Sequence, residues 1–360
     1  MRAMLFFLPR HVRNRLISGF ALSLLALPAL AADAWETIAP GGETSCALGT
    51  PYTFHARRAD PDKVVVFFNG GGACWAGQTC DPSVEPTTYV PSAQMGHNDP
   101  RTHKGIFDLG NPANPVGDWS MVFVSYCTGD VHLGGIDRAY TKPDGSEITI
   151  RHRGHANANA ALNWMKENFG DAKEILVAGS SAGAVASPIY AGVVAKTHPD
   201  ANVHHLGDGA GGYGAENVST TLEAWDLSNS LPDWAIGQNM DKGFTGLYLN
   251  AIAAFPDIPF AQYDAAHDRV QIQFSQALRG SSELLPQLND NREVVSAAAE
   301  GFQSFTAGGA EHTILRAPYL YSYSVNGTSF VDWLSMLVSD EQPTTVSCAN
   351  SEEGCDNAPS

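Results

Sequence analysis

Basic residues are scarce in this sequence of 360 residues, in which 21 Lys and Arg stand against 38 Asp and Glu and the formal net charge is −17 at pH 7. Nucleic-acid binding depends on basic patches that neutralise phosphates, so no nucleic-acid partner is expected. The same charge gives no attraction toward polyanions, which argues against a strongly charged polysaccharide as a ligand.

Long hydrophobic runs are also missing, apart from Leu16–Leu30, which at about 15 residues is short for a membrane span. Four arginines precede this run, and the small-x-small sequence Ala29-Leu30-Ala31 ends it. We therefore predict a secretory signal peptide over residues 1–31, hence a secreted or periplasmic protein without stable membrane insertion. An uncleaved anchor is the alternative.

The sequence contains no H-E-x-x-H motif, and its six cysteines lack zinc-site spacings, so neither a metal nor another cofactor is expected. An even cysteine count in an exported chain predicts three disulfides. Short spacing favours Cys74–Cys80 and Cys348–Cys355, which leaves Cys46–Cys127. This pairing is one of about 15 that six cysteines allow.

No repeat, linker or low-complexity segment divides residues 32–360, which we predict to be a single domain. Strand and helix patterns alternate, and this predicts an α/β fold with a doubly wound, mostly parallel sheet and helices on both faces. The expected strands are Lys63–Phe68, Ser120–Cys127, Glu147–His152, Glu174–Ala178, Asn202–Leu206 and Pro259–Tyr263. The expected helices are Asn157–Phe169, Ala184–Lys196, Phe244–Phe255, Pro286–Phe305 and Phe330–Leu337.

Two segments depart from this alternation. Residues 81–115 lack periodicity and contain six prolines, so we expect a lid or insertion over the sheet. Residues 339–360 are acidic and carry the last two cysteines, and we expect a peripheral tail that a disulfide staples.

A G-x-S-x-G motif, Gly179–Gly183, lies between a buried strand and a helix of small residues. This context is typical of a nucleophile elbow, in which a serine sits on a tight turn flanked by residues without bulky side chains. Ser181 is therefore the candidate nucleophile. An ordinary structural turn is the alternative, because glycine and serine are common.

Three glycines, Gly70–Gly72, directly follow the strand Lys63–Phe68. Backbone N–H groups of such a loop, together with the N–H after the nucleophile, can form an oxyanion hole. We predict Gly71, Gly72 and Ala182 as the donors. The alternatives are a flexible linker or an anion-binding nest without catalysis.

A serine nucleophile needs a histidine base and a carboxylate that orients it, in the chain order Ser, Asp or Glu, His for this architecture. Of the later histidines, His312 lies in a glycine-rich loop far downstream, whereas His267 precedes every plausible acid except Asp264. We predict His312 as the base. Asp264 and Asp268 both follow the strand Pro259–Tyr263, and local chemistry does not separate them.

Together, in this order, the motifs resemble the pectin acetylesterase/Notum family of carboxylesterases. The matching segments are Phe68–Cys74 with Cys80-Asp81, Trp119 with Tyr126–Val131, Ala178–Ala184, Asp208–Gly211, and His312-Thr313 with Val325–Gly327. The resemblance implies an α/β-hydrolase-like fold, and its D-x-x-Q pattern fits Asp268–Gln271, which selects Asp268 as the acid with Asp264 in reserve. Candidate substrate contacts beside these motifs are Asn69, Trp75, Asp130 and Asp208, with a turn role as the alternative for Asp130.

These features predict a monomeric serine esterase that uses Ser181, His312 and Asp268 without metal or cofactor. Its substrate would be a small-molecule or polysaccharide ester carrying an O-acetyl or other short acyl group on a carbohydrate-like or other alcohol. The alternatives are a lipase or ester-polymer depolymerase on the same scaffold, and a non-catalytic carbohydrate- or surface-binding relative. Ala73 is small where animal members carry a large aromatic residue, so the family's substrate specificity does not transfer.

Overall fold

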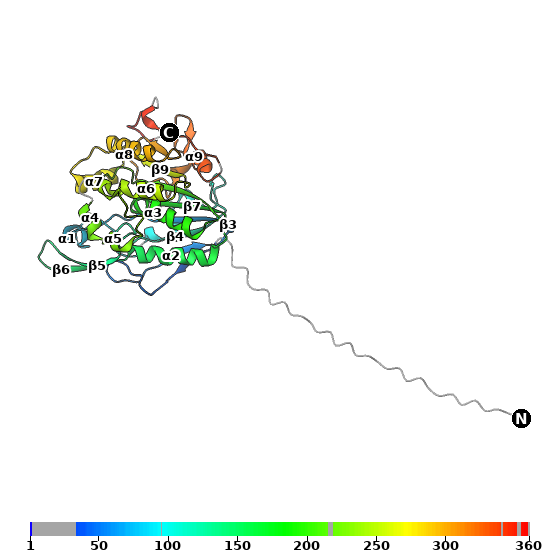
Figure 1. Cartoon of the computed structure of the whole chain (residues 1–360), viewed down its shortest axis with the longest axis horizontal. Coiled ribbons are helices and arrows are strands. Elements are labelled where there is room, and N and C mark those ends of the chain that lie inside the picture. The colour runs from blue at the N-terminus through cyan, green and yellow to red at the C-terminus, as the bar shows by residue number, and fades with distance from the viewer. Residues whose placement is uncertain (2–33, 95, 215–218, 340, 351–353, 359–360) are drawn as a thin grey trace. The chain divides into compact units, whose positions relative to one another are not determined.

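A nine-stranded sheet forms the centre of the computed structural model, which describes residues 1, 34–94, 96–214, 219–339, 341–350 and 354–358 (Figure 1). The strand order is β1-β2-β4-β3-β7-β8-β9-β10-β13, and all neighbouring pairs from β4 to β13 are parallel, whereas β2 is antiparallel to β1 and β4. The strands are β1 (Trp35–Ile38), β2 (Phe54–Arg57), β3 (Asp60–Phe68), β4 (Trp119–Val124), β7 (Glu174–Ser180), β8 (Asn202–Asp208), β9 (Phe260–Ala265), β10 (Gln303–Ala307) and β13 (Val346–Ser347). The predicted α/β fold with a mostly parallel sheet is confirmed.

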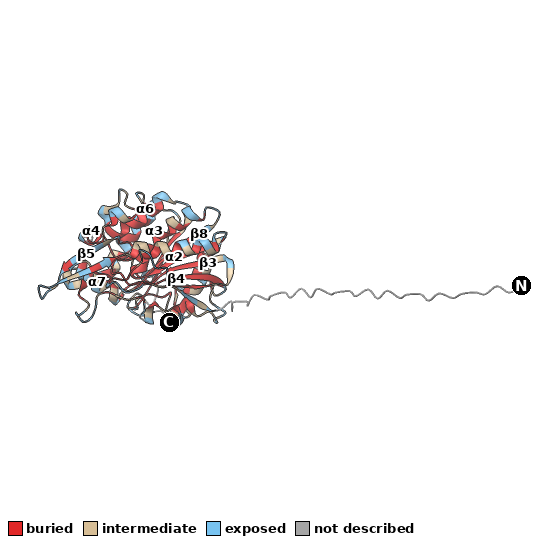
Figure 2. Ribbon diagram, turned by 90° about the horizontal axis from the view of Figure 1, so that it is seen from below, coloured by how far each residue is buried: buried red, intermediate tan, exposed pale blue. Residues whose placement is uncertain are grey.

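The sheet divides the hydrophobic core into two halves because successive side chains of a strand point to opposite faces. In β3, Val64, Val66 and Phe68 belong to one half, and Val65 and Phe67 belong to the other. The first half packs under α2 (Gly154–Phe169), α3 (Ala182–Thr197) and α6 (Gly243–Ala254), and the second under α9 (Phe330–Leu337) and the 3₁₀ helices η3 (Gly105–Phe107) and η5 (Pro318–Tyr321). Figure 2 shows buried strands with exposed residues on the outer sides of the helices.

The remaining elements connect these layers. Two hairpins stand apart from the central sheet, β5 (Ile136–Thr141) with β6 (Glu147–His152), and β11 (Ser324–Val325) with β12 (Thr328–Ser329). The other helices are α1 (Gly77–Cys80), η1 (Gly96–Asn98), η2 (Pro100–Thr102), α4 (Ser219–Ala224), α5 (Leu227–Ser230), η4 (Met240–Lys242), α7 (Arg269–Arg279), α8 (Leu284–Ala298) and η6 (Cys348–Asn350).

Two predicted elements differ from the structure. The strand Glu147–His152 is present as β6, but it pairs with β5 outside the central sheet. The single helix expected over Pro286–Phe305 is wrong, since α8 ends at Ala298 and Gln303–Ala307 forms β10 beside β9. Gly301 breaks the helical pattern, and the following residues, QSFTA, suit a strand that is buried on both faces.

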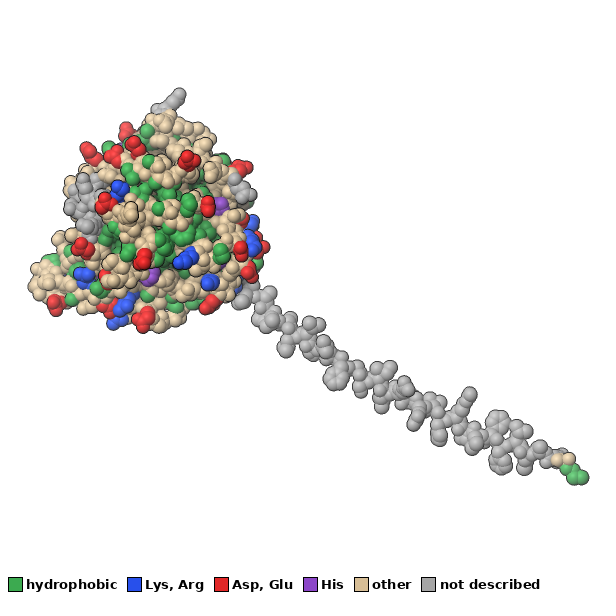
Figure 3. Space-filling view, viewed as in Figure 1, with side chains coloured by type: hydrophobic (Ala, Val, Ile, Leu, Met, Phe, Trp, Pro, Cys, Tyr) green, Lys and Arg blue, Asp and Glu red, His purple; other side chains and the backbone are tan. Residues whose placement is uncertain are grey.

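All three predicted disulfides, Cys46–Cys127, Cys74–Cys80 and Cys348–Cys355, are present, which confirms the pairing. Among the described residues, no helix combines the length and the apolar character needed to cross a bilayer. The predicted signal peptide, residues 1–31, lies outside the described residues except for Met1. Figure 3 shows acidic side chains scattered over one face of the molecule, with fewer basic ones between them.

Candidate active site

Ser181 occupies a strained turn between β7 and α3, with φ +56° and ψ −121°. Such angles are rare for residues other than glycine and recur at functional sites. The flanking glycines leave no space for side chains: a Cβ atom at Gly179 would lie 2.3 Å from the carbonyl oxygen of Gly183, and one at Gly183 would lie 1.9 Å from that of Phe68. The local geometry is therefore that of a nucleophile elbow.

The glycine-rich loop after β3 packs directly on this elbow. A Cβ atom at Gly70 would lie 2.8 Å from the Cβ atom of Ser181, and one at Gly72 would lie 1.9 Å from the carbonyl oxygen of Thr88. Within the described part of the chain, the N–H groups of Gly71, Gly72 and Ala182 donate to no acceptor. These N–H groups are available to a ligand beside Ser181.

Asp208, at the end of β8, joins the elbow to the loop that carries His312. Its backbone oxygen accepts the N–H of Ser181 at 2.7 Å, and its carboxylate accepts the Ser180 hydroxyl at 2.6 Å. The same carboxylate accepts the N–H groups of Ile314 and Leu315 at 3.0 and 2.9 Å. Burial raises the pKa of Asp208 to about 6. These contacts favour a positioning role over the predicted contact with substrate.

The Nδ1 side of the His312 ring contacts a carboxylate. Its Nδ1 atom lies 2.7 Å from Oδ2 of the fully buried Asp268. Oδ1 of Asp268 caps α7 by accepting the N–H groups of Val270 and Gln271 at 2.9 and 3.1 Å. Because its oxygens are held on both sides, this carboxylate can fix both the tautomer and the orientation of the imidazole.

Asp264, the alternative candidate for the catalytic acid, interacts with other residues than His312. Its Oδ2 atom forms a buried ion pair with Arg292 at 2.7 Å, and its Oδ1 atom accepts the N–H of Gly211 at 2.9 Å. The amide of Gln271 donates to both acids, at 2.8 Å to Asp264 and 3.1 Å to Asp268. The other histidine considered, His267, has a side chain that is 43% exposed and faces the C-terminal tail.

The Nε2 atom of His312 is buried and has no hydrogen-bond partner among the described residues. The imidazole ring lies against Gly209, where a Cβ atom would be 3.4 Å from its Cε1 atom. The preceding residue, Asp208, holds the N–H of Ser181. His312 and Ser181 therefore both contact the two-residue segment Asp208-Gly209, and the unpartnered nitrogen is the one that a serine base would use.

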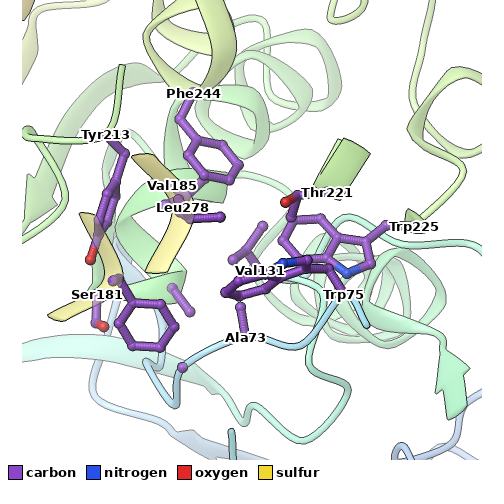
Figure 4. A pocket seen from close by; sticks show the side chains of 13 residues that line it. Ala73, Trp75, Val131, Ser181, Val185, Tyr213, Thr221, Trp225, Phe244 and Leu278 are labelled. Atoms are coloured by element: carbon purple, nitrogen blue, oxygen red, sulfur yellow. The ribbon is translucent and has the colours of Figure 1, made fainter. Parts of the chain in front are cut away.

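A pocket opens beside Ser181, with about 380 Å³ of empty space including its mouth (Figure 4). Gly72 and Ala182 contribute to its lining at the serine. Five aromatic side chains form much of its wall: Trp75, Tyr213, Trp225, Phe244 and Phe274. Apart from Trp75, these residues come from the stretch between β8 and α8. No described residue of 81–115 lines this pocket.

The predicted substrate contacts divide into two groups. Trp75 lines the pocket. Asn69 and Asp130 are fully buried, and each is engaged by protein partners: Asn69 accepts from Arg316 at 2.7 Å, and Asp130 accepts from Thr128 at 2.5 Å. Burial raises the pKa of Asp130 to about 7. Both residues thus resemble Asp208 in supporting the loops around the pocket.

One group of potential metal ligands lies outside this site and consists of Cys74, Cys80 and His152. The two cysteines form a disulfide, and the ring nitrogens of His152 contact Tyr140 and the carbonyl of Thr128. The disulfide sulfurs are not thiolates, so these residues do not supply the donor set that a zinc ion requires.

The parallel sheet, the elbow and the glycine-rich loop define a protein of the α/β-hydrolase class. A comparison with family models gives the narrower assignment: the pectinacetylesterase model matches residues 39–242, which is more than half of the chain. The chain belongs to the pectinacetylesterase family, a family of carboxylic ester hydrolases. The matched segment includes Ser181 and ends before Asp268 and His312. A search of curated proteins finds no match to the chain.

Sequence reasoning missed several residues that shape the site. No short motif includes Arg292, which pairs with Asp264. The same is true of the pocket-wall residues Tyr213, Trp225 and Phe274. The strong apolar face of α7 and the D-x-x-Q pattern at its start were the available signals for Phe274 and Gln271. Nothing local in the sequence indicated which later helices would cover the pocket.

Proposed function

We propose that this protein is a secreted serine carboxylesterase that cleaves its substrate through an acyl-enzyme intermediate. The substrate would be an ester of a carbohydrate-like or other alcohol, with an acetyl group, as the family's name suggests, or another compact acyl group. The observation that carries this proposal is the buried, unpartnered Nε2 atom of His312, whose Nδ1 atom is held by Asp268 beside the elbow of Ser181.

The first half of the reaction forms the acyl-enzyme. Ser181 Oγ attacks the ester carbonyl carbon while His312 Nε2 accepts the hydroxyl proton. The negative charge on the carbonyl oxygen is stabilised by the N–H groups of Gly71, Gly72 and Ala182. The bond to the alcohol oxygen then breaks, and the imidazolium returns its proton to the departing alcohol.

The second half regenerates the enzyme. A water molecule gives a proton to His312 and attacks the acyl-enzyme carbonyl carbon, and collapse of the intermediate breaks its bond to Ser181 Oγ. Ser181 recovers its proton, and the carboxylic acid leaves. Asp268 stays ionised throughout and stabilises the imidazolium. No step of this reaction requires a metal or cofactor.

The test is hydrolysis of p-nitrophenyl acetate, butyrate and octanoate by the mature protein and by Ser181→Ala and His312→Ala. We expect each variant to lose several orders of magnitude in kcat, about 10³-fold or more, with unchanged thermal unfolding. Gly110→Ala is the matched control, since a Cβ atom there meets nothing within 4 Å. Wild-type rates in Ser181→Ala would reject Ser181 as the nucleophile, and absence of hydrolysis by the wild-type protein would leave the non-catalytic binding protein as the explanation.

A further inference from the structure

The pocket beside Ser181 is more apolar than an acetyl group needs. An acetyl group places one methyl beyond the reacting carbonyl, whereas this pocket is walled by five aromatic side chains together with Val131, Val185 and Leu278. Apolar walls of this kind gain affinity by burying apolar or aromatic surface, which a single methyl group does not supply.

The position of the pocket identifies which half of the ester it receives. His312 must lie near the alcohol oxygen because it protonates that oxygen as the alcohol departs. The pocket lining includes Ser181 and two of the three proposed oxyanion donors, Gly72 and Ala182, but not His312. The alcohol therefore lies toward His312, and the acyl group enters the pocket.

One polar atom in the wall lacks a partner. Thr221 on α4 lines the pocket with a residue exposure of 1%, and its hydroxyl has no hydrogen-bond partner in the part of the chain that the structure describes. Figure 4 shows this hydroxyl turned into the pocket between Phe244 and the two tryptophans, at the side opposite Ser181. The neighbouring Trp225, in contrast, donates its indole N–H to the carbonyl oxygen of Cys74 at 2.8 Å.

A buried hydroxyl without a partner is costly, and a ligand that supplies the missing hydrogen bond removes that cost. The aromatic walls favour a planar ring between them, through edge-to-face or offset contacts. The two requirements meet in one kind of group: an aromatic ring attached to the acyl carbonyl, with a hydroxyl on the far side of the ring.

We propose that the pocket selects a hydroxyaryl acyl group, such as a 4-hydroxybenzoyl or 4-hydroxycinnamoyl ester, and that Thr221 is a specificity-determining residue that hydrogen-bonds its phenolic hydroxyl. This inference rests on the proposed function, because it assigns the acyl group of the same reaction. Ester cleavage follows the steps already given and adds no reactant.

The test compares matched methyl esters that differ only in the phenolic hydroxyl: 4-hydroxycinnamate with cinnamate, and 4-hydroxybenzoate with benzoate. The ratio of kcat/KM within each pair is measured for wild type and for Thr221→Val, which keeps the shape and removes the hydroxyl. Taking the change in this ratio between the two proteins cancels the intrinsic reactivity of each ester. Ser275→Ala is the matched control, since its hydroxyl is also buried and unpartnered but lies outside the pocket lining.

We expect Thr221→Val to lower the preference for the hydroxylated ester about tenfold in at least one pair, and Ser275→Ala to leave it unchanged. The affinity of Ser181→Ala for 4-hydroxycinnamate can be measured by tryptophan fluorescence. It should fall by a similar factor in the double variant Ser181→Ala, Thr221→Val. An unchanged ratio in both pairs would overturn the role of Thr221. Hydrolysis of p-nitrophenyl acetate without cleavage of any of the four methyl esters, whose acyl groups are aromatic, would overturn the acyl assignment and leave the esterase function intact. Equal activity of wild type and Ser181→Ala would instead overturn the proposed serine esterase function.

Discussion

The imidazole of His312 and the carboxylate of Asp268 lie 2.7 Å apart, although 44 positions separate them in the chain. Asp268 is fully buried, and it reaches His312 with the oxygen that does not cap α7. Asp264, four residues earlier in β9, is equally buried but pairs with Arg292. Two neighbouring acids thus have different partners, and their variants should fail in different ways.

We expect Asp268→Asn to lower kcat by about 10³- to 10⁴-fold, because an amide no longer fixes the imidazole in the tautomer that accepts the serine proton. Its stability should change little, since Asn also caps helices. Asp264→Asn should instead lower the free energy of unfolding by about 3–5 kcal/mol, because it leaves the Arg292 guanidinium buried without its counter-ion. Urea denaturation and steady-state kinetics on both variants separate the two effects. A larger loss of kcat in Asp264→Asn than in Asp268→Asn would contradict the assignment of the acid.

The elbow should not tolerate even one added methyl group. We expect Gly183→Ala to abolish measurable esterase activity, since its Cβ atom would lie 1.9 Å from the carbonyl oxygen of Phe68 and force β3 or α3 to move. Gly110→Ala, where the added atom meets nothing within 4 Å, is the control and should match wild type. Activity with p-nitrophenyl acetate gives the readout, and wild-type activity in Gly183→Ala would show that the backbone there yields easily.

Stability should fall as the solution becomes acidic. Burial lowers the pKa of His132 and His152 to about 4 and that of His205 to about 3. These residues bind fewer protons in the folded than in the unfolded chain between their folded pKa values and about 6.5, so acidification through that window destabilises the fold. Asp130 and Asp208, with pKa values raised to about 7 and about 6, bind more protons when folded and oppose this trend.

The lowered histidine pKa values outweigh the raised pKa values of the two acids, so the free energy of unfolding should be lower at pH 5 than at pH 7. Urea denaturation at the two pH values measures this difference. NMR titration of the histidine rings is the companion measurement, in which the three buried rings stay neutral at pH 5. Equal or greater stability at pH 5 would contradict the assignment of these histidines as buried and neutral.

The C-terminal tail contacts the loop that carries His312. The N–H of Gly309 donates to the carbonyl oxygen of Cys355 at 2.9 Å, and a Cβ atom at Gly308 would lie 2.1 Å from the carbonyl oxygen of Asn357. The disulfide to Cys348 holds these residues in place. The tail predicted as peripheral is therefore part of the support for His312.

We expect the double variant Cys348→Ser, Cys355→Ser to lower kcat about tenfold with little change in KM, because the loop loses its outer support while the pocket is untouched. The loop that this disulfide closes is short, so the loss of stability should be about 2 kcal/mol. Asp356→Ala serves as the control, since that side chain is 93% exposed and should not affect either parameter. Unchanged kcat in the double variant would remove the tail from the supports of the site.

The sequence was sufficient for much of the sheet and for the elbow, because both depend on local patterns. Buried strands such as Glu174–Ser180 are mostly apolar, and Gly179 is required by a backbone contact with Gly183, only four residues away. The disulfides followed from spacing once export was assumed. The choice of Asp268 over Asp264 came from a family pattern and not from local chemistry.

What the sequence could not indicate depended on contacts between distant segments. Arg292 neutralises Asp264 across 28 positions, and the strand Gln303–Ala307 is recognisable only once β9 offers it an edge. The pocket walls come from helices whose apolar residues look like ordinary core in isolation. The segment 81–115 has the composition of a lid, yet its Ile106 and Phe107 are buried in the core half opposite α2 and α3.

The two sides of the pocket differ in how they are built, and this has a practical consequence for engineering. Around Ser181, main-chain atoms pack on main-chain atoms, so random mutagenesis there should yield mostly inactive clones. Elsewhere the lining consists of exchangeable side chains, among them Thr221, Phe244, Phe274 and Leu278. A small combinatorial library confined to these four positions should retune which esters are accepted while leaving the reaction chemistry as it is.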